Sequence, residues 1–511
     1  MILLVHPPVA KPAEPPAGVA RLSGMLDAMG IRHAVLDANL EGMLYLIERS
    51  HRPSERDDAW TVRAFRGRRN NLSLLRNLAL YHHFDRYKRA VKDLSRVLEV
   101  SSASYEANIG LANYQHQTLS PLRSADLISA AERPERDPFY PYFAARLTEM
   151  MREWQPRFVG FSLNYLSQAI CAFAMIGFLR REFPGRNIVL GGGLVTSWVK
   201  GTPWKHPFSG LVDHFIAGPG EYELLSILGI ERPEKKSFTP AYRGLNGQEY
   251  LSPGFVLPYS ASSGCYWNRC DFCPEKAEGN EYVPVPVETV LSDLRILRER
   301  TNPAIVHLLD SAISPALMEG LSESRPGVPW YGFARVGRHL TDLDFCIALK
   351  RSGCVMLKLG IESGDQGVLE SMQKGIDVET ASASLKTLNK VGIAAYVYLI
   401  FGTPAETAAG AWKTLDFVAA HSNCISFLNL AIFNMPVCSA EASGLETRKF
   451  YEGDLSLYTD FSHPRGWDRR AVRTFLETAF KRDPTVSAIL KREPPVFTSN
   501  HAPFFIMPSG T

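Results

Sequence analysis

The spacing of apolar and polar positions at the start of the chain predicts a βαβ unit. Residues 1–5 (MILLV) form a continuous apolar run, a Pro/Ala/Gly loop follows, and residues 18–29 have the apolar spacing of a helix. A second short apolar run, at 34–36, ends at Asp37. Continuous apolar runs of this length are typical of strands covered on both faces, so a parallel sheet is expected.

The same alternation resumes after a long interruption. From about 48 to 147 the chain is rich in Arg, Leu and Tyr with helical periodicity and few strand signals, which predicts a helical insertion. The elements expected beyond it are strand 158–163, helix 168–181, strand 187–190, a turn at Gly191-Gly192-Gly193 and strand 214–217. We therefore expect an α/β domain over residues 1–232, a doubly wound, Rossmann-like sheet.

A polar, Pro- and Gly-containing stretch, residues 233–256, is expected to link this domain to a second alternating series. The elements expected in that series are helix 287–300, strands 305–309 and 330–334, helix 342–352, strand 356–361, helix 380–391, strand 395–401, helix 406–420 and strand 425–433. Repeated βα units of this kind are typical of a full or partial TIM-like (β/α) barrel, here over 257–450. An aromatic- and proline-rich C-terminal extension, 451–511, lies outside it.

Composition narrows the class of protein. Hydrophobic residues make up 45% and charged residues 21%, as in globular proteins. The net charge of +3 arises from 56 basic and 53 acidic residues, so no bulk attraction to nucleic acid is expected. No apolar stretch reaches the roughly 18 residues of a membrane helix, and residues 1–5 are too short for a signal peptide. We therefore expect a cytosolic protein with no membrane span.

Three of the eight cysteines, Cys265, Cys270 and Cys273, lie within nine residues. In a chain without an export signal, such clustering favours a metal site over disulfides. Their loop follows a predicted first barrel strand, at the end where barrel enzymes place their chemistry. Three cysteines can hold an iron–sulfur cluster with one iron left open, whereas structural zinc takes four ligands. The zinc alternative requires a histidine such as His307 or His339, neither of which has zinc-finger spacing.

With the aromatic Phe272 before its last cysteine, this loop resembles that of the radical S-adenosylmethionine (radical SAM) superfamily. Two later regions resemble the family's strands and turns: residues 360–375, with GIES and MQKG, and residues 398–407 (YLIFGTPAET). The loop departs from the family's spacing, because four residues rather than three separate Cys265 from Cys270. An extra residue that bulges outward leaves the thiols in place.

The resemblance implies a [4Fe–4S] cluster that cleaves S-adenosylmethionine into methionine and a 5′-deoxyadenosyl radical. It also implies an electron donor such as flavodoxin or ferredoxin. The residues that it assigns to S-adenosylmethionine binding are Phe272, Asp310, Arg335, Glu362, Ile400, Phe401 and Gly402.

Each of these assignments has a structural alternative. Arg335 is expected to pair with the carboxylate of S-adenosylmethionine, or to form a salt bridge at a strand end. Glu362 and Asp310 are expected to bind its ribose or amino group, or to be solvated at the barrel rim. Residues 400–402 are expected to contact adenine, or to be plain core.

The N-terminal domain resembles the cobalamin-binding domain that precedes the barrel in one large subset of this superfamily. The matching pieces are loops at the carboxyl ends of successive strands, where doubly wound sheets bind cofactors. The residues that the resemblance assigns to cobalamin are Pro7, Pro8, Ser162, Gly191, Gly192, Gly193, Thr196, Gly218, Gly220 and Glu221. The alternative is a Rossmann-like scaffold that binds no cofactor and only docks on the barrel.

Cobalamin domains often carry Asp-x-His-x-x-Gly, whose histidine binds cobalt. The nearest match here is residues 37–42 (DANLEG), with Asn39 in the place of the histidine. An amide is a poor ligand for cobalt, so we expect no histidine ligation and treat the match as chance.

These resemblances together imply a cobalamin-dependent radical SAM enzyme, most often a methyltransferase that acts on an unactivated carbon or phosphorus of a small-molecule or peptide substrate. A ring rearrangement or cyclisation with the same cofactors is an alternative. A non-catalytic sensor that carries the cluster or cobalamin is another, although no output module such as a helix-turn-helix is visible. We expect the helical insertion to cap the cofactor or shape the substrate entrance. The C-terminal extension, with Trp467 and His501, is expected either to close over the active site or to pack as a tail.

Overall fold

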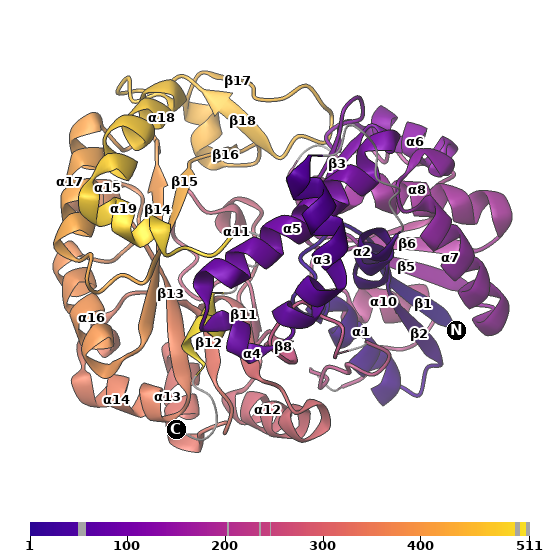
Figure 1. The fold of residues 1–511 in the computed structure, drawn as a ribbon, viewed down its shortest axis with the longest axis horizontal. Helices are drawn as coiled ribbons and strands as arrows, with labels where there is room; N and C mark the ends of the chain where they lie inside the picture. Colours follow the sequence, from indigo (N-terminus) through magenta and orange to yellow (C-terminus); the bar gives the residue numbers. More distant parts are fainter. Residues whose placement is uncertain (50–57, 202–203, 235–236, 246, 496–500, 507–511) are drawn as a thin grey trace. The chain divides into compact units, whose positions relative to one another are not determined.

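The computed structural model describes residues 1–511 except 50–57, 202–203, 235–236, 246, 496–500 and 507–511. The chain divides into two compact units, each built around its own sheet (Figure 1). Unit 1 comprises Met1–Val256, Tyr451–Leu457 and Pro495–His501, and unit 2 comprises Leu257–Phe450, Tyr458–Pro494 and Ala502–Thr511.

The sheet of unit 1 is parallel and has the strand order β2-β1-β5-β6-β7. Its strands are β1 (Ile2–His6), β2 (His33–Asp37), β5 (Phe158–Ser162), β6 (Asn187–Gly191) and β7 (His214–Ile216). The strand order reverses between β1 and β5, which makes this position the topological switch point of a doubly wound sheet. The predicted Rossmann-like parallel sheet is confirmed.

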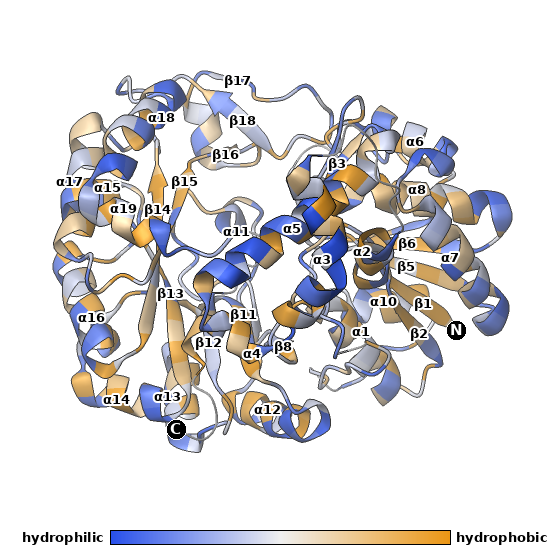
Figure 2. Cartoon of the chain, viewed as in Figure 1, coloured by the Kyte–Doolittle hydropathy of each residue, from blue (hydrophilic) through white to orange (hydrophobic). Residues whose placement is uncertain are grey.

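Both faces of this sheet are covered, as its continuous apolar strands require. Ile2 and Leu4 of β1 pack against α1 (Ala17–Ala28) and α10 (Glu221–Ile227), while the alternate residues of β1 point to the opposite face. The hydropathy colouring shows these strands as predominantly hydrophobic (Figure 2). The other helices that directly follow its strands are α2 (Ala38–Glu48), α8 (Leu166–Glu182) and α9 (Gly193–Gly201).

The insertion is mainly helical, as expected. Its helices are α3 (Ala59–Leu75), α4 (Leu78–Tyr81), α5 (Phe84–Ser102), α6 (Ser124–Glu132) and α7 (Tyr140–Trp154). It also contains a short antiparallel hairpin, β3 (Ala107–Ile109) and β4 (Tyr114–His116), which hydrophobic patterning did not predict because strands of three residues carry little periodic signal.

The insertion forms a second layer over α8. Residues 168–179 of α8 are all buried, so this helix is covered on every side. Gly177 makes the closest approach, because a Cβ added there would overlap the backbone carbonyl of Ala131 in α6. A helix that is apolar all round is typical of a helix between two layers. The insertion is therefore part of the packed body of unit 1.

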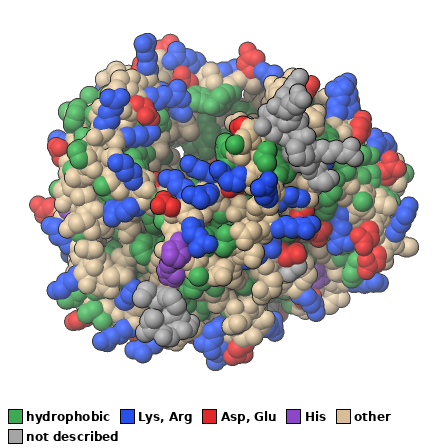
Figure 3. Space-filling view, viewed as in Figure 1, with side chains coloured by type: hydrophobic (Ala, Val, Ile, Leu, Met, Phe, Trp, Pro, Cys, Tyr) green, Lys and Arg blue, Asp and Glu red, His purple; other side chains and the backbone are tan. Residues whose placement is uncertain are grey.

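The exposed face of α3 and α5 is basic. Figure 3 shows blue side chains over the position that these helices hold in Figure 1. Arg63, Arg66 and Arg69 are exposed, and Arg63 lies 3.2 Å from the carboxylate of Asp93 on α5. Such a hydrated, partly ion-paired helix face contributes little to stability, because solvent screens each pair.

The described residues of the expected linker, 233–256, pack along unit 1. The amide of Ala241 donates to Ala20 O over 2.9 Å, and the Tyr250 hydroxyl donates to Asp37 over 2.6 Å. Tyr250 is 2% exposed. This segment is thus an ordered cover rather than a free tether.

The sheet of unit 2 has the order β15-β14-β13-β12-β11-β8, and its strands pair in parallel from β11 to β15. The strands are β8 (Val256–Tyr259), β11 (Ile305–Ile313), β12 (Trp330–Ala334), β13 (Cys354–Glu362), β14 (Ala394–Phe401) and β15 (Phe427–Ile432). The helices are α12 (Val287–Thr301), α13 (Pro315–Ser324), α14 (Leu343–Arg351), α15 (Gln366–Ser371), α16 (Val378–Val391) and α17 (Ala408–Ala420). The open order identifies a partial rather than a closed barrel.

Strand β11 and helix α13 differ from the expectation, as does the short helix α15, which was not predicted. Strand β11 continues to Ile313, past a shift in its pairing with β12 after Leu308. Helix α13 was not predicted, although Ser314 caps it by accepting from Leu317 N over 3.2 Å and Pro315 occupies its first turn. The helix is short, which weakens its periodic signal.

The C-terminal extension folds largely onto unit 2. It supplies β18 (Tyr458–Phe461), which pairs with β16 (Met435–Pro436) and β17 (Thr447–Lys449), and the helices α18 (Arg469–Thr478) and α19 (Pro484–Lys491). Trp467 is 8% exposed and His501 is 2% exposed, so both pack as core residues. Among the helices that the structure describes, none is long and apolar enough to cross a membrane.

Candidate functional site

The three clustered cysteines lie in one loop at the carboxyl end of β8. The loop begins after β9 (Ser262–Ser263), and Cys273 directly precedes α11 (Pro274–Ala277). Cys265, Cys270 and Cys273 are free thiols of intermediate exposure. Burial raises the pKa of Cys270 to about 11 and that of Cys273 above its usual value. Because only thiolates bind metal, positive charge from iron would have to offset this shift.

The charge of one thiol affects the pKa of another, which places the three sulfur atoms in one neighbourhood. In the described part of the chain, however, no three or more His, Cys, Asp or Glu side chains surround a single metal-ion position. Zinc draws four ligands around one centre, whereas a [4Fe–4S] cluster distributes its thiolates over separate irons. The three clustered thiols are the donor type that iron–sulfur clusters take.

The two histidines that zinc would need have other surroundings. His307 stacks on Tyr331 with ring centroids 4.3 Å apart, and its Nε2 lies 3.2 Å from Lys358 Nζ. His339 lies near Arg335, whose charge adds to the effect of burial in lowering the pKa of the imidazole. Neither arrangement places a histidine as a fourth ligand beside the cysteines.

The start of the cysteine loop is held by Asp310 of β11. This carboxylate is 3% exposed and accepts from Ser262 Oγ at 2.5 Å and from the amide of Ala261 at 3.2 Å. Gly264 follows with φ of 68°, where a Cβ would overlap the backbone carbonyl of Glu281. Asp310, predicted to contact S-adenosylmethionine, therefore has at least a positioning role at the base of the loop.

The extra residue between the first two cysteines is accommodated on the outside of the loop. Asn268 adopts a left-handed φ of 42°, and both Asn268 and Arg269 are exposed. Trp267 instead packs inward, and its indole Nε1 donates to Gln373 O over 3.0 Å. The loop therefore accommodates its extra residue at exposed positions, while Trp267 anchors it on the inside.

Arg335 completes that anchor from the end of β12. Its guanidinium lies 3.6 Å from the centroid of the Trp267 ring and donates to the carbonyls of Lys374 and, over 2.7 Å, Gly375. Gly375 has φ of 65°, and a Cβ there would overlap the indole. We call Trp267, Arg335 and Gly375 the tryptophan clamp.

A second set of contacts holds the loop next to Cys270. Lys374 Nζ lies 2.8 Å from Glu362 Oε1 at the end of β13, and their side chains are 10% and 12% exposed. The same ammonium lies 5.5 Å from the centroid of the Phe272 ring. Both charges influence the pKa of Cys270. The structure therefore brings the predicted residues Phe272, Arg335 and Glu362 together around the cysteines.

At the end of β14, the residues predicted to contact adenine differ in burial. Ile400 is partly exposed, while Phe401 is fully buried with its ring 5.2 Å from that of Phe480. Since neighbouring residues of a strand point to opposite faces, only Ile400 presents its side chain to the barrel interior. Phe401 has only backbone groups to offer there.

Gly402 begins a turn closed by a buried carboxyl group. Its amide donates to Glu406 Oε2 at 2.5 Å, and the same oxygen accepts from Trp467 Nε1 at 2.9 Å. Glu406 is fully buried, which raises its pKa to about 7. Glu406 lies within residues 398–407, which resemble a family motif, and the resemblance assigns it no role.

In unit 1, the residues assigned to cobalamin lie along the carboxyl edge of the sheet. Pro7 and Pro8 follow β1, and Pro7 O accepts from the Gln168 side chain at 2.7 Å. Asn164 connects two further strands, because its amide donates to Ser162 Oγ over 3.1 Å and its Oδ1 accepts from Gly193 N at 3.0 Å. Asn164 was not predicted, since only the fold brings its loop to β6.

The loops after β6 and β7 are also joined. Thr196 Oγ1 donates to Gly192 O over 3.0 Å and accepts from Gly218 N at 2.9 Å. Gly218 has φ of 86°, and a Cβ there would meet no atom within 4 Å. Open space beside a backbone that lacks side chains fits the approach of a large planar ring. Glu221 is committed to an ion pair with Arg21 at 2.5 Å.

The motif at residues 37–42 has local structural roles. Asp37 caps α2 by accepting from Leu40 N at 3.0 Å, and Asn39 Oδ1 accepts from Ala10 N at 2.8 Å while being 2% exposed. A Cβ at Gly42 would lie 3.0 Å from the Phe139 ring. These contacts agree with the interpretation of the match as chance.

Comparison with known proteins identifies the barrel. Residues 259–418 match the family model described as the radical SAM superfamily. The match places this part of the chain, the barrel region, in the radical SAM superfamily. The match begins at Tyr259, just before the cysteine loop, and ends within α17.

Two named relatives are methyltransferases. An uncharacterized methyltransferase of Pyrococcus horikoshii is 24% identical over 53% of this chain and 66% of its own length. The bacteriochlorophyllide d C-12(1)-methyltransferase of Chlorobaculum tepidum is 28% identical over 32% of this chain. The alignment covers only 37% of that second relative.

Two solved structures share the fold across both units. The radical S-adenosylmethionine methyltransferase TsrM from Kitasatospora setae, with cobalamin and a [4Fe–4S] cluster bound, superposes with a TM-score of 0.53 and 15% identity over 88% of this chain and 81% of its own. The cobalamin-dependent radical enzyme OxsB gives a TM-score of 0.53 and 14% identity over 84% of this chain and 53% of its own.

Proposed function

We propose that this radical SAM protein is a cobalamin-dependent methyltransferase that acts on an unactivated carbon or phosphorus of a small-molecule or peptide substrate. The observation that carries the proposal is the presence in one chain of the three-cysteine loop in unit 2 and the glycine-lined switch-point edge in unit 1. TsrM, which shares the fold of both units, is a methyltransferase with both cofactors bound. Both named relatives are methyltransferases as well.

When bound, the cluster supplies the electron that cleaves S-adenosylmethionine, and cobalamin carries the methyl group. Cys265, Cys270 and Cys273 would hold the cluster as thiolates. Their immediate neighbours Lys374 and Arg335 add positive charge, which favours ionised sulfur. A low-potential donor such as flavodoxin or ferredoxin delivers the electron.

Arg335 is proposed to bind the carboxylate of S-adenosylmethionine. Its Nη2 donates to the carbonyls of Lys374 and Gly375, but among the described residues its buried Nε has no hydrogen-bond partner. A buried donor without an acceptor is costly, and an incoming carboxylate would satisfy it. Burial lowers the pKa of this guanidinium, which nevertheless stays charged at neutral pH.

The barrel interior is proposed to hold the adenosyl group and the substrate. Ile400 supplies an apolar side chain on the inner face of β14, and the buried pair of Lys374 and Glu362 lies beside Phe272. In a site closed to water, such fixed charges orient a polar ligand strongly. Glu362 is proposed to accept from the ribose or the amino group.

The test is product analysis with S-adenosylmethionine labelled in its methyl group, using anaerobic, reconstituted protein and a strong reductant. We expect 5′-deoxyadenosine together with label in a product other than methionine. Label confined to methionine would exclude methyl transfer and favour a rearrangement or cyclisation. Absence of 5′-deoxyadenosine would overturn the radical chemistry and favour a sensor.

A further inference from the structure

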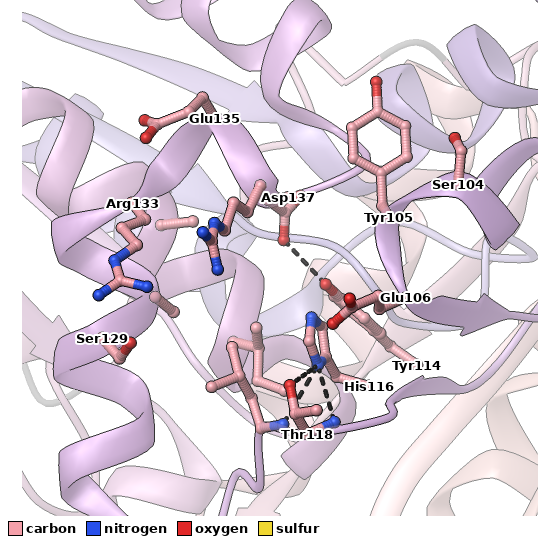
Figure 4. A pocket seen from close by; sticks show the side chains of 15 residues that line it. Ser104, Tyr105, Glu106, Tyr114, His116, Thr118, Ser129, Arg133, Glu135 and Asp137 are labelled. Atoms are coloured by element: carbon pink, nitrogen blue, oxygen red, sulfur yellow. Dashed lines mark hydrogen bonds between the residues drawn. The ribbon is translucent and has the colours of Figure 1, made fainter.

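Unit 1 contains a cavity in its helical insertion that the proposed function does not use. Its volume is about 400 Å³, within the range of small-molecule sites. The residues just before β3, the strand β4, the end of α6, the turn η2 (Pro134–Arg136) and one side of α8 surround it (Figure 4). None of the residues assigned to cobalamin lines it.

The floor of the cavity is apolar and buried. Ala130 of α6 and Ile170 and Ala174 of α8 line it, and their exposed fractions are 6%, 4% and 1%. Beside them, the Tyr114 hydroxyl donates to Asp137 Oδ2 over 3.1 Å, and Asp137 Oδ1 accepts from Phe139 N at 2.9 Å. This carboxyl group therefore has its acceptors occupied by the protein.

The rim of the cavity offers hydrogen-bond donors. Arg133 and Arg136 line it, and within the described residues neither guanidinium has a hydrogen-bond or ion-pair partner. His116 Nδ1 accepts from the amides of Thr118 and Leu119 at 3.2 and 3.1 Å (Figure 4). Burial lowers the pKa of His116, so its ring is neutral at pH 7 and carries its proton on Nε2.

Two acidic side chains remain at the rim. Glu135 lies 3.4 Å from Arg181, which lines no part of the cavity, and this exposed ion pair is screened by solvent. Glu106 faces the cavity and is outnumbered by Arg133 and Arg136. The lining thus holds two guanidinium groups without partners among the described residues, next to three carboxyl groups, of which those of Glu135 and Asp137 have partners in the protein.

We propose that this cavity binds a small organic anion. Its carboxylate or phosphate group lies at Arg133 and Arg136, with a further hydrogen bond from His116 Nε2. Its apolar part lies against α6 and α8. Guanidinium groups are well suited to both anions, because each presents paired N–H donors. This binding does not depend on the radical chemistry of unit 2.

Calorimetric titration of the full chain, without S-adenosylmethionine or cobalamin, tests the proposal. The probes are phenyl phosphate, benzoate, inorganic phosphate and benzyl alcohol. We expect saturable binding of phenyl phosphate or benzoate, and the tighter of the two identifies the anion. Inorganic phosphate lacks the apolar part and benzyl alcohol lacks the charge, so both should bind more weakly.

Variants locate the binding. Arg133→Gln and Arg136→Gln should each weaken it by about fivefold. Ser129→Phe should weaken it without changing the charge, because Ser129 lines the cavity from α6. Arg152→Gln is the matched control, since Arg152 is exposed on α7 and lines no part of the cavity.

The proposal is overturned if neither organic anion saturates, if benzyl alcohol or inorganic phosphate binds as tightly, or if the Arg133 and Arg136 variants bind as the unaltered protein does. Loss of binding in Arg152→Gln to the same extent would also overturn it, because the effect would then reflect general surface charge.

Discussion

At the residue scale, the site depends on side chains that hold the cysteine loop as much as on the cysteines. The tryptophan clamp fixes the loop between Cys265 and Cys270 against the end of β12. Asp310 fixes its beginning. Groups that orient metal ligands typically change metal affinity strongly when they are removed. Substitutions in the clamp should therefore reduce cluster binding, as substitutions of the ligands do.

Substitution of Gly375 by Ala should release the clamp, because the added Cβ would overlap the Trp267 indole. We expect cluster retention, measured as iron and labile sulfide per chain, to fall by about tenfold. Gly392→Ala is the matched control, because Gly392 also has a positive φ, 75°, but its Cβ would have only ordinary contacts at 3.9 Å. Equal cluster loss in both variants would show that backbone strain, not the clamp, is responsible.

Glu406 should make stability depend on pH. Its pKa is raised from 4.5 to about 7 by burial, so between these values the folded chain keeps a proton that the unfolded chain has released. The stability from this group is complete below the unfolded pKa and is lost as pH rises through the folded pKa.

Replacement of Glu406 by Gln keeps an acceptor for Gly402 N and Trp467 Nε1 and removes the titration. Between about pH 5 and 8, the melting temperature of the unaltered protein should fall by about 4 °C relative to the Gln variant. Glu319→Gln, at an exposed position on α13, is the control and should run parallel to the unaltered protein. Parallel curves for Glu406→Gln would contradict the prediction.

At the scale of elements, close backbone contact joins the insertion to the sheet domain. α8 is apolar all round because α6 covers the side that the sheet does not. The hydrophobic pattern of α8 records this burial. The identity of the covering helix is visible only in the fold.

Gly177→Ala should destabilise unit 1 by about 2 kcal/mol, because its Cβ would overlap the Ala131 carbonyl and push α6 from α8. Gly67→Ala is the matched control within a helix of the same unit, where the nearest atom, Asn71 Nδ2, is 3.5 Å away. Gly67→Ala should leave the free energy of unfolding unchanged or raise it by up to about 1 kcal/mol. Thermal unfolding of the full chain measures both, and similar losses would argue against close helix packing at Gly177.

At the scale of the whole molecule, the proposed cofactors belong to different units. The cluster ligands lie in unit 2, and the glycine-rich edge lies in unit 1. Each unit has its own sheet. The two binding functions should therefore be separable by substitution.

The triple variant Cys265→Ala, Cys270→Ala, Cys273→Ala should lose iron and retain bound corrinoid. Gly218→Leu should lose bound corrinoid and retain iron, because the leucine side chain would enter the open space beside the glycine backbone. Gly210→Leu is the control, since Gly210 has φ of 81° and open surroundings but precedes β7. Metal analysis and corrinoid absorption measure both cofactors. An unchanged corrinoid content in Gly218→Leu would refute the assignment of corrinoid binding to this edge of the sheet.

The sequence by itself determined two features of this protein. Apolar runs of the length typical of buried strands indicate where the strands lie, and three thiols within nine residues indicate a metal site. These are local properties, and the fold class and the cysteine loop follow from them. Their boundaries shifted little, except that β11 extends to Ile313 and that Ser314 and Pro315 begin a helix too short for a clear period.

Only the tertiary structure decided which distant residues meet. Trp267 and Gly375 are more than a hundred positions apart, as are Asp37 and Tyr250, and no local pattern encodes their contact. Phe401 and Ile400 are neighbours in sequence, yet the pleat sends one into core and the other toward the barrel interior. Hydrophobic periodicity reports whether a side chain is buried, whereas its partner depends on how the elements pack.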